Sequence, residues 1–60
     1  MKFNDYEYEI TLGNGTIIRR EYILPDFFSK EEVDMLVNSY ITEDKEVLEH
    51  GLVSYRRIMY

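Results

Sequence analysis

The sequence predicts an α+β fold, in which a three-stranded antiparallel sheet packs against one main helix in the order β-β-α-β, with room for a short second helix. Three observations predict it: two strand-like segments joined by a glycine-rich turn, a helix-spaced apolar stripe after them, and a β-branched C-terminal segment. Sixty residues form one domain, which spans residues 1–60.

The first two strands form a predicted hairpin. Residues 5–12 alternate between apolar and polar side chains, as expected of a strand with one buried face. Residues 16–24 are rich in β-branched side chains, and the Asn14-Gly15 pair before them is typical of a tight turn. Pro25 ends the second strand because proline cannot donate a hydrogen bond to a sheet.

Turn length decides the register of this hairpin. A two-residue turn would place Ile10 opposite Arg19, an apolar side chain against a charge. A three-residue loop with a left-handed Gly15 is favoured, although it places Glu7 opposite Glu21. Its other cross-strand pairs are favourable: Ile10 with Ile18, Tyr6 with Tyr22, and Glu9 with Arg19 as its ionic partner.

One amphipathic helix is predicted over residues 28–41. Ser29 is a natural N-cap, and Glu32 three residues later completes a capping box. Phe28 and Val33 are placed to pack over this first turn, and the two phenylalanines before the cap are expected to fill the corner between sheet and helix. The buried stripe, with the spacing i, i+3, i+4, i+7 and i+8, consists of Val33, Leu36, Val37, Tyr40 and Ile41.

Residues 42–51 have three interpretations. Thr42 can cap a short second helix in which Val47 and Leu48 face inward and Gly51 is the stop. A continuation of the main helix, or a strand that begins near Val47, are the alternatives. Residues 52–60 mix β-branched and aromatic side chains without helical spacing, and are predicted to form the third strand.

Composition excludes several kinds of site. The chain has no cysteine and a single histidine, His50, so a zinc site would need carboxylates or a second chain; we expect no metal and no cofactor. Without a cysteine nucleophile, a second histidine or a glycine-rich phosphate-binding motif, we expect no enzymatic activity. A chain of this size buries only about 60% of its unfolded surface, so we expect a homodimer.

The sequence also bears on location. No apolar run approaches the ~20 residues of a membrane span. The N-terminal segment lacks the apolar core of a signal peptide. We therefore expect a complete, soluble, cytoplasmic protein with no membrane partner.

The net charge of −5 is unevenly distributed. Residues 26–50 carry eight acids and two bases, a balance of −6, whereas the remaining 35 residues carry four acids and five bases, a balance of +1. Charged faces usually serve solubility alone. A rigid acidic face can also compete for the basic groove of a DNA-binding protein, which is the more specific interpretation.

The outer face of the main helix is the candidate binding site. Met35 points away from the buried stripe, and its helical neighbours are acids and small polar residues. A single exposed methionine is also ordinary on a protein surface. The candidate partner-binding residues are Glu31, Glu32, Asp34, Met35, Asn38 and Ser39.

A small module that binds single-stranded nucleic acid is the competing candidate, built from tyrosines and arginines on the sheet. Its arginines are Arg19, Arg20, Arg56 and Arg57. Neighbouring residues of a strand point to opposite faces, so the four do not form one patch, and the negative net charge repels a polyanion. We expect no direct nucleic-acid partner.

Three local segments resemble a known family, the very small uracil-DNA glycosylase inhibitors encoded by phages related to phi29. Residues 8–11 resemble the family's first strand of tyrosine, acid, aliphatic and threonine. Residues 15–22 are similar to its glycine-containing hairpin and tyrosine-bearing strand. Residues 29–33 resemble its helix start of serine, acid, aromatic, glutamate and valine, except that Glu31 stands in place of the aromatic.

The resemblance implies a homodimer whose paired helices bind the host uracil-DNA glycosylase and block base excision in the infected cell. Glu32 would take the position of a glutamate that contacts the enzyme, and Met35 that of a tyrosine lining the interface. Carboxylates would replace DNA phosphates, and an apolar pocket between the helices would receive the wedge that the enzyme inserts into DNA. A DNA mimic that inhibits another enzyme, such as a nuclease or a CRISPR effector, fits the same residues.

Overall fold

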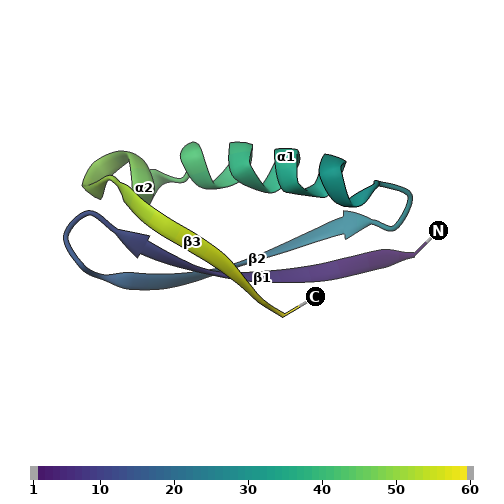
Figure 1. The fold of residues 1–60 in the computed structure, drawn as a ribbon, viewed down its shortest axis with the longest axis horizontal. Helices are drawn as coiled ribbons and strands as arrows, with labels where there is room; N and C mark the ends of the chain where they lie inside the picture. Colours follow the sequence, from purple (N-terminus) through teal and green to yellow (C-terminus); the bar gives the residue numbers. More distant parts are fainter. Residues whose placement is uncertain (1, 60) are drawn as a thin grey trace.

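A computed structural model describes residues 2–59 and confirms the α+β fold with a short second helix (Figure 1). The elements are β1 (Phe3–Leu12), β2 (Ile17–Pro25), α1 (Lys30–Thr42), α2 (Lys45–His50) and β3 (Leu52–Met59). The third strand is present as predicted, while Tyr60 lies outside the described residues. Among these elements, neither helix has the length and apolar content needed to cross a membrane.

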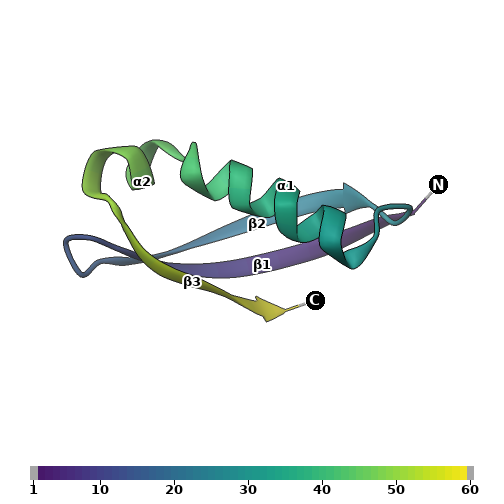
Figure 2. The same cartoon turned by 45° about the horizontal axis from the view of Figure 1, so that its top comes forward.

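The three strands form one antiparallel sheet in the order β2-β1-β3, so β1 is central and β2 and β3 are the edges. Both helices lie over the same side of this sheet, and its other side is uncovered (Figures 1 and 2). We call the uncovered side the open face. Because the buried residues of β1 are even-numbered, the open face carries the odd-numbered residues of β1 and β2.

The hairpin has the predicted register. Ile10 lies opposite Ile18, and the neighbouring cross-strand pairs follow from it, including the unfavourable pair of Glu7 and Glu21. Gly15 has a φ of +87°, a conformation that L side chains rarely adopt, as the three-residue loop requires. Side-chain alternation and one glycine therefore determine the pairing of β1 with β2.

The prediction that Glu9 forms its ion pair with Arg19 is wrong. Arg19 lies opposite Glu9 on β2, but the ion pair of Glu9 is with Arg56 of β3, at 3.1 Å between Oε1 and Nη2. Because β1 is the central strand, Glu9 has a cross-strand arginine on each side. The hairpin pattern alone cannot show which of the two it contacts.

The core lies between the sheet and α1. Val33, Val37 and Ile41 of α1 are buried at the spacing i, i+4 and i+8. The buried stripe is narrower than predicted, because Leu36 is half-buried and Tyr40 is exposed. The ring of Tyr40 stacks on the ring of Tyr22 from β2. The buried hydrophobic residues are Tyr8, Ile10, Leu12, Leu24, Val33, Val37, Ile41 and Val47.

The start of α1 has the predicted capping box. The backbone amide of Glu32 donates to the Ser29 hydroxyl at 3.1 Å, and the backbone amide of Ser29 donates to Oε1 of Glu32 at 2.8 Å. Phe28 is half-buried against the core, but Phe27 remains 65% exposed, so only one of the two phenylalanines fills the corner. The ring of Phe27 packs on that of Phe28, with centroids 4.6 Å apart.

The second helix begins later than predicted. Thr42 is the last residue of α1, and Asp44 is the N-cap of α2, accepting from the amide of Glu46 at 2.9 Å. With the helix start moved, Val47 is buried but Leu48 points outward, contrary to the prediction. Gly51 is the C-cap as predicted, with a φ of +83°.

Candidate functional site

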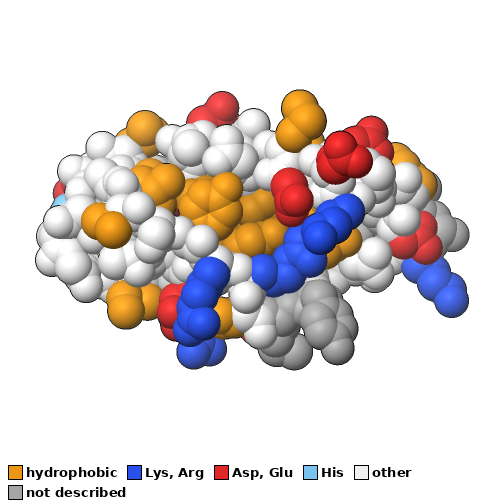
Figure 3. All heavy atoms as spheres, viewed as in Figure 1, with side chains coloured by type: hydrophobic (Ala, Val, Ile, Leu, Met, Phe, Trp, Pro, Cys, Tyr) orange, Lys and Arg blue, Asp and Glu red, His pale blue; other side chains and the backbone are white. Residues whose placement is uncertain are grey.

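The outer face of α1 is exposed at all six predicted residues. Met35 is 72% exposed, which places this apolar side chain outside the monomer core. Figure 3 shows several acidic side chains along the α1 side of the molecule, and acidic and basic side chains close together lower in the view. Two strand arginines nevertheless reach this side of the molecule, because Arg57 contacts Asp34 and Arg20 contacts Asp44.

A shallow hollow of about 290 Å³ lies along one flank of this face. It is lined by Phe28, Glu32, Met35, Leu36 and Ser39, and we call it the α1 hollow. Three of the predicted residues are thus brought together around an apolar floor. Sequence reasoning assigned Phe28 and Leu36 to the core alone and missed their second role. The spacing i, i+4, i+7, i+8 and i+11 of the five residues is the signal that could have found it.

The acidic residues of the site differ in the contacts that they make within the chain. Glu32 has one carboxylate oxygen in the capping box. Asp34 lies 3.5 Å from Nη2 of Arg57, in a pair with both partners partly exposed, which contributes little to stability. Glu31, in the first turn of α1, makes no ion pair with any residue in the described range 2–59. Its charge is therefore the most available for a partner.

The other flank of α1 is attached to β3. The hydroxyl of Tyr55 donates to Oδ1 of Asn38 at 2.9 Å, next to the pair of Asp34 and Arg57. The Arg57 guanidinium lies 4.9 Å from the ring centroid of Tyr6, in cation–π geometry. Asp34 and Asn38 thus belong to the β3 side of the helix and are not part of the α1 hollow.

The four arginines are divided between the two sides of the sheet, as strand alternation predicted. Arg20 and Arg57 face the helices, where Arg20 pairs with Asp44 at 2.7 Å. Arg19 and Arg56 belong to the open face. These positions do not combine into a single basic groove.

The open face has an acidic end. A shared hydrogen bond with Asp5 and the negative charges of Asp5 and Glu7 raise the pKa of Glu21 above its usual value. Three carboxylates therefore crowd one part of the sheet surface. Sequence reasoning identified the opposition of Glu7 and Glu21 but not the contribution of Asp5.

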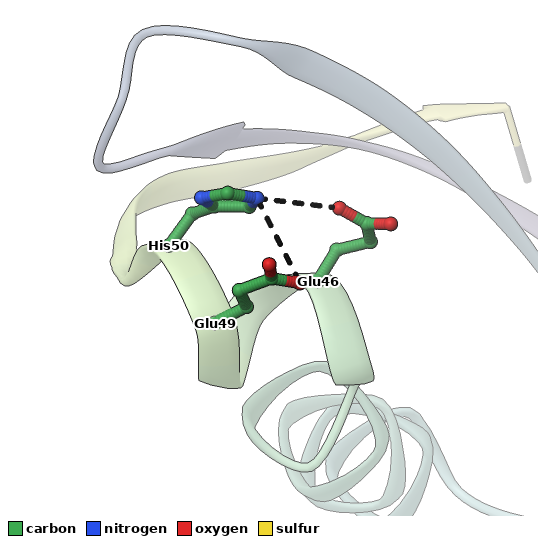
Figure 4. Close-up of side chains that lie close together, drawn as sticks. All are labelled: Glu46, Glu49 and His50. Carbon is green, nitrogen blue, oxygen red and sulfur yellow. Dashed lines mark ion pairs between the residues drawn. The ribbon is translucent and has the colours of Figure 1, made fainter.

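A cluster on α2 combines the single histidine with two carboxylates (Figure 4). Nε2 of His50 lies 3.7 Å from Oε2 of Glu46 and 3.9 Å from Oε2 of Glu49. One ligand atom from each residue lies within 4.8 Å of the other two, so these side chains could supply metal ligands. Contacts between an imidazole and carboxylates one and four residues earlier on the same helix account for these distances, and we assign no metal to the cluster.

Compared with protein-family models, with curated proteins and with solved structures, the chain matches none of them.

Proposed function

We propose that the protein is an acidic DNA mimic that binds the DNA-binding site of a host uracil-DNA glycosylase and blocks base excision. The observation that carries the proposal is the α1 hollow, in which exposed Met35 lies beside Phe28 and Leu36 with the carboxylate of Glu32 at its rim. An apolar depression with a carboxylate at its rim is a surface that could replace DNA in such an enzyme.

The mechanism follows from how a glycosylase handles DNA. The enzyme holds phosphates with basic groups and inserts an apolar side chain into the base stack to flip out the uracil. In the inhibited complex, Glu31 and Glu32 stand in for phosphates, and the α1 hollow receives the inserted side chain. The inhibitor is folded before it binds, so it avoids the unstacking that DNA must undergo.

Two further features support a protein partner over a nucleic-acid partner. Residues 26–50 hold most of the negative charge and include the whole of α1. The helix-facing arginines, Arg20 and Arg57, already contact Asp44 and Asp34, which leaves fewer cations for phosphates. An inhibitor of a host repair enzyme acts in the cytoplasm of the infected cell.

The test is a uracil-excision assay with a bacterial uracil-DNA glycosylase and increasing amounts of the purified chain. Inhibition is expected at near-stoichiometric amounts. Glu32→Gln keeps the capping box, because glutamine also accepts at this position, while it removes the charge. Met35→Ala removes the apolar centre of the hollow. Each variant is expected to weaken inhibition at least tenfold without a change in the circular dichroism spectrum.

Leu48→Ala is the matched control, because Leu48 on α2 is exposed to the same extent as Met35. It is expected to inhibit like the unmodified chain. An unrelated DNA-binding nuclease, assayed in parallel, tests the target: inhibition of the nuclease alone would replace the glycosylase with another DNA-binding enzyme. Full inhibition by both the Glu32→Gln and Met35→Ala variants would refute the role of the α1 hollow.

A further inference from the structure

Strand β2 is an edge strand whose outward hydrogen-bonding groups can be identified from the hairpin. The amide of Leu12 donates to the carbonyl of Thr16 at 2.8 Å, which continues the β1–β2 register by one pair. Hydrogen-bonded and non-hydrogen-bonded pairs alternate along an antiparallel ladder. The even-numbered residues of β2 therefore bond to β1. The residues that turn N–H and C=O outward are Ile17, Arg19, Glu21 and Ile23.

The same four residues carry a self-complementary pattern on the open face. In chain order they are apolar, basic, acidic and apolar. Ile17 is 58% and Ile23 is 60% exposed, although both are large aliphatic side chains on a strand. If a second copy of β2 runs antiparallel to the first about a twofold axis at Arg20, each Arg19 meets Glu21 of the other copy. Each Ile17 then meets Ile23 of the other copy.

We propose that two copies of this chain pair through their β2 edges, about Arg20, to form one continuous six-stranded antiparallel sheet. Pairing about Arg20 brings outward-turned residues opposite one another, as hydrogen bonding requires. The two nearest registers that also do so are unfavourable, because a centre at Arg19 or at Glu21 opposes like charges. Among these three registers, only the one centred on Arg20 pairs opposite charges on the open face, so the charge pattern of β2 fits a second copy of the same strand.

The helix side of the strand is compatible with this pairing. Arg20 would lie opposite its own copy at the twofold axis, but each Arg20 is already paired with Asp44. Its Nη1 also donates to the outward-turned carbonyl of Arg19 at 3.0 Å, and this oxygen keeps a second lone pair for the partner strand. Tyr22 would lie opposite Ile18 of the other copy, and both side chains are partly buried against the core. A groove of about 380 Å³ runs along this edge, lined by Glu21, Tyr22, Ile23, Leu24, Tyr40 and Glu43.

The paired arrangement also covers an otherwise unprotected strand edge, which is a liability in small β proteins. The twofold axis is perpendicular to the sheet, so both copies of α1 lie over the same side of the extended sheet. The inference does not rest on glycosylase inhibition, since it uses only β2 and its neighbours. Its test measures self-association and is independent of the excision assay.

The first measurement is sedimentation of the 60-residue chain from micromolar to millimolar concentration, together with amide hydrogen exchange. A dimer is expected, with exchange at Arg19, Glu21 and Ile23 slowing as the concentration rises. The amides of Arg20 and Tyr22, which bond to β1, are expected to stay protected throughout. A monomer at millimolar concentration, or a dimer in which the odd-numbered amides of β2 exchange freely, would overturn the proposal.

Charge variants give the second measurement. Glu21→Arg and Arg19→Glu each place like charges opposite one another twice in the dimer, and each is expected to raise the dissociation constant about tenfold or more. The double variant R19E/E21R restores opposite charges and is expected to restore dimerisation. Glu21→Arg also places a base opposite Glu7 within the monomer, so its fold is expected to be retained. Unchanged dimerisation in both single variants would refute the interface.

Discussion

Arg20 of β2 and Asp44, the N-cap of α2, are joined by two hydrogen bonds, at 2.7 Å from Nε to Oδ2 and at 3.4 Å from Nη2 to Oδ1. Asp44 also accepts from the backbone amide of Glu46, so one carboxylate serves two purposes. Asp44 caps the N-terminus of α2, and its ion pair with Arg20 holds the connection between α1 and α2 against edge strand β2. The guanidinium of Arg20 lowers the pKa of Asp44 below its usual value, with the backbone bonds adding to the effect.

Asp44→Ala removes both functions and is expected to lower the free energy of unfolding by about 2 kcal/mol. Asp44→Asn retains a capping oxygen and is expected to cost less. Chemical denaturation monitored by circular dichroism measures both. Glu43→Gln, at the neighbouring exposed acid, is the control and is expected to be close to neutral. Equal losses in the Asn and Ala variants would show that the cap contributes nothing.

The same pair predicts a dependence on pH. The pKa of Asp44 is lower in the folded chain than its usual 3.8, so ionised Asp44 stabilises the fold above that value. This stabilisation is lost as the pH falls through the lowered pKa. The stability difference between the unmodified chain and Asp44→Asn is therefore expected to be constant near neutrality and to shrink below about pH 3.8. A difference that stays constant down to pH 2 would contradict this account.

Tyr22 has a buried hydroxyl with no hydrogen-bond partner in the described part of the chain. Burial raises the pKa of Tyr22, and the nearby charge of Asp44 raises it further. Tyr22→Phe removes an uncompensated polar group and keeps the ring stacked on Tyr40, so it is expected to stabilise the fold by about 1 kcal/mol. Tyr55→Phe, which loses the bond to Asn38, is expected not to stabilise. Thermal unfolding of the two variants side by side distinguishes these outcomes.

The two hairpin glycines are required for different reasons. A Cβ at Gly13 would overlap the carbonyl oxygen of His50, where the hairpin loop meets the end of α2. Gly15 has open space around it but a positive φ. Gly13→Ala is expected to cost about 2–3 kcal/mol through this overlap, and Gly15→Ala about 1 kcal/mol through backbone strain.

Asparagine separates the two causes, because it tolerates a positive φ better than alanine does. Gly15→Asn is expected to recover much of the loss, whereas Gly13→Asn is expected to be at least as damaging as Gly13→Ala. Denaturation midpoints of the four variants provide the comparison. Recovery by asparagine at Gly13 would show that glycine is required there for its backbone conformation. It would also show that the hairpin loop does not press on α2.

The sequence predicted those parts of the fold that depend on near neighbours in the chain. The capping box needs only Ser29 and Glu32, three residues apart, and both of its hydrogen bonds are present. The hairpin register needs only side-chain alternation and Gly15. In each case the local pattern is energetically decisive, because a shift by one residue would expose apolar side chains or leave amides unpaired.

The prediction errors arise where a residue distant in the sequence determines the local structure. Of the three interpretations of residues 42–51, the short helix is correct, but its N-cap is Asp44 and not Thr42; Asp44 is the residue that Arg20, twenty-four positions earlier, contacts. Glu9 has arginines on both neighbouring strands, and the choice depends on β3. The α1 hollow was only partly predicted, because Leu36 lies at the border between the core and the outer face.

The acidic end of the open face gives a pH dependence of the opposite sign to that of Asp44. The pKa of Glu21 is raised above its usual 4.5, first by a hydrogen bond with Asp5 and then by the charges of Asp5 and Glu7. Ionised Glu21 therefore lowers stability at neutral pH, and this loss is relieved as the pH falls through the raised pKa. The effect belongs to the monomer and is measured at a concentration at which the chain sediments as a monomer.

Glu21→Gln removes the charge and is expected to raise the thermal midpoint at pH 7 relative to the unmodified chain. The advantage is expected to shrink as the pH is lowered towards 4.5, because the native carboxylate then becomes protonated. Glu31→Gln, at an exposed acid outside this cluster, is the control and is expected to show no such convergence. An advantage that is independent of pH would mean that glutamine stabilises β2 by some route other than relief of the repulsion among Asp5, Glu7 and Glu21.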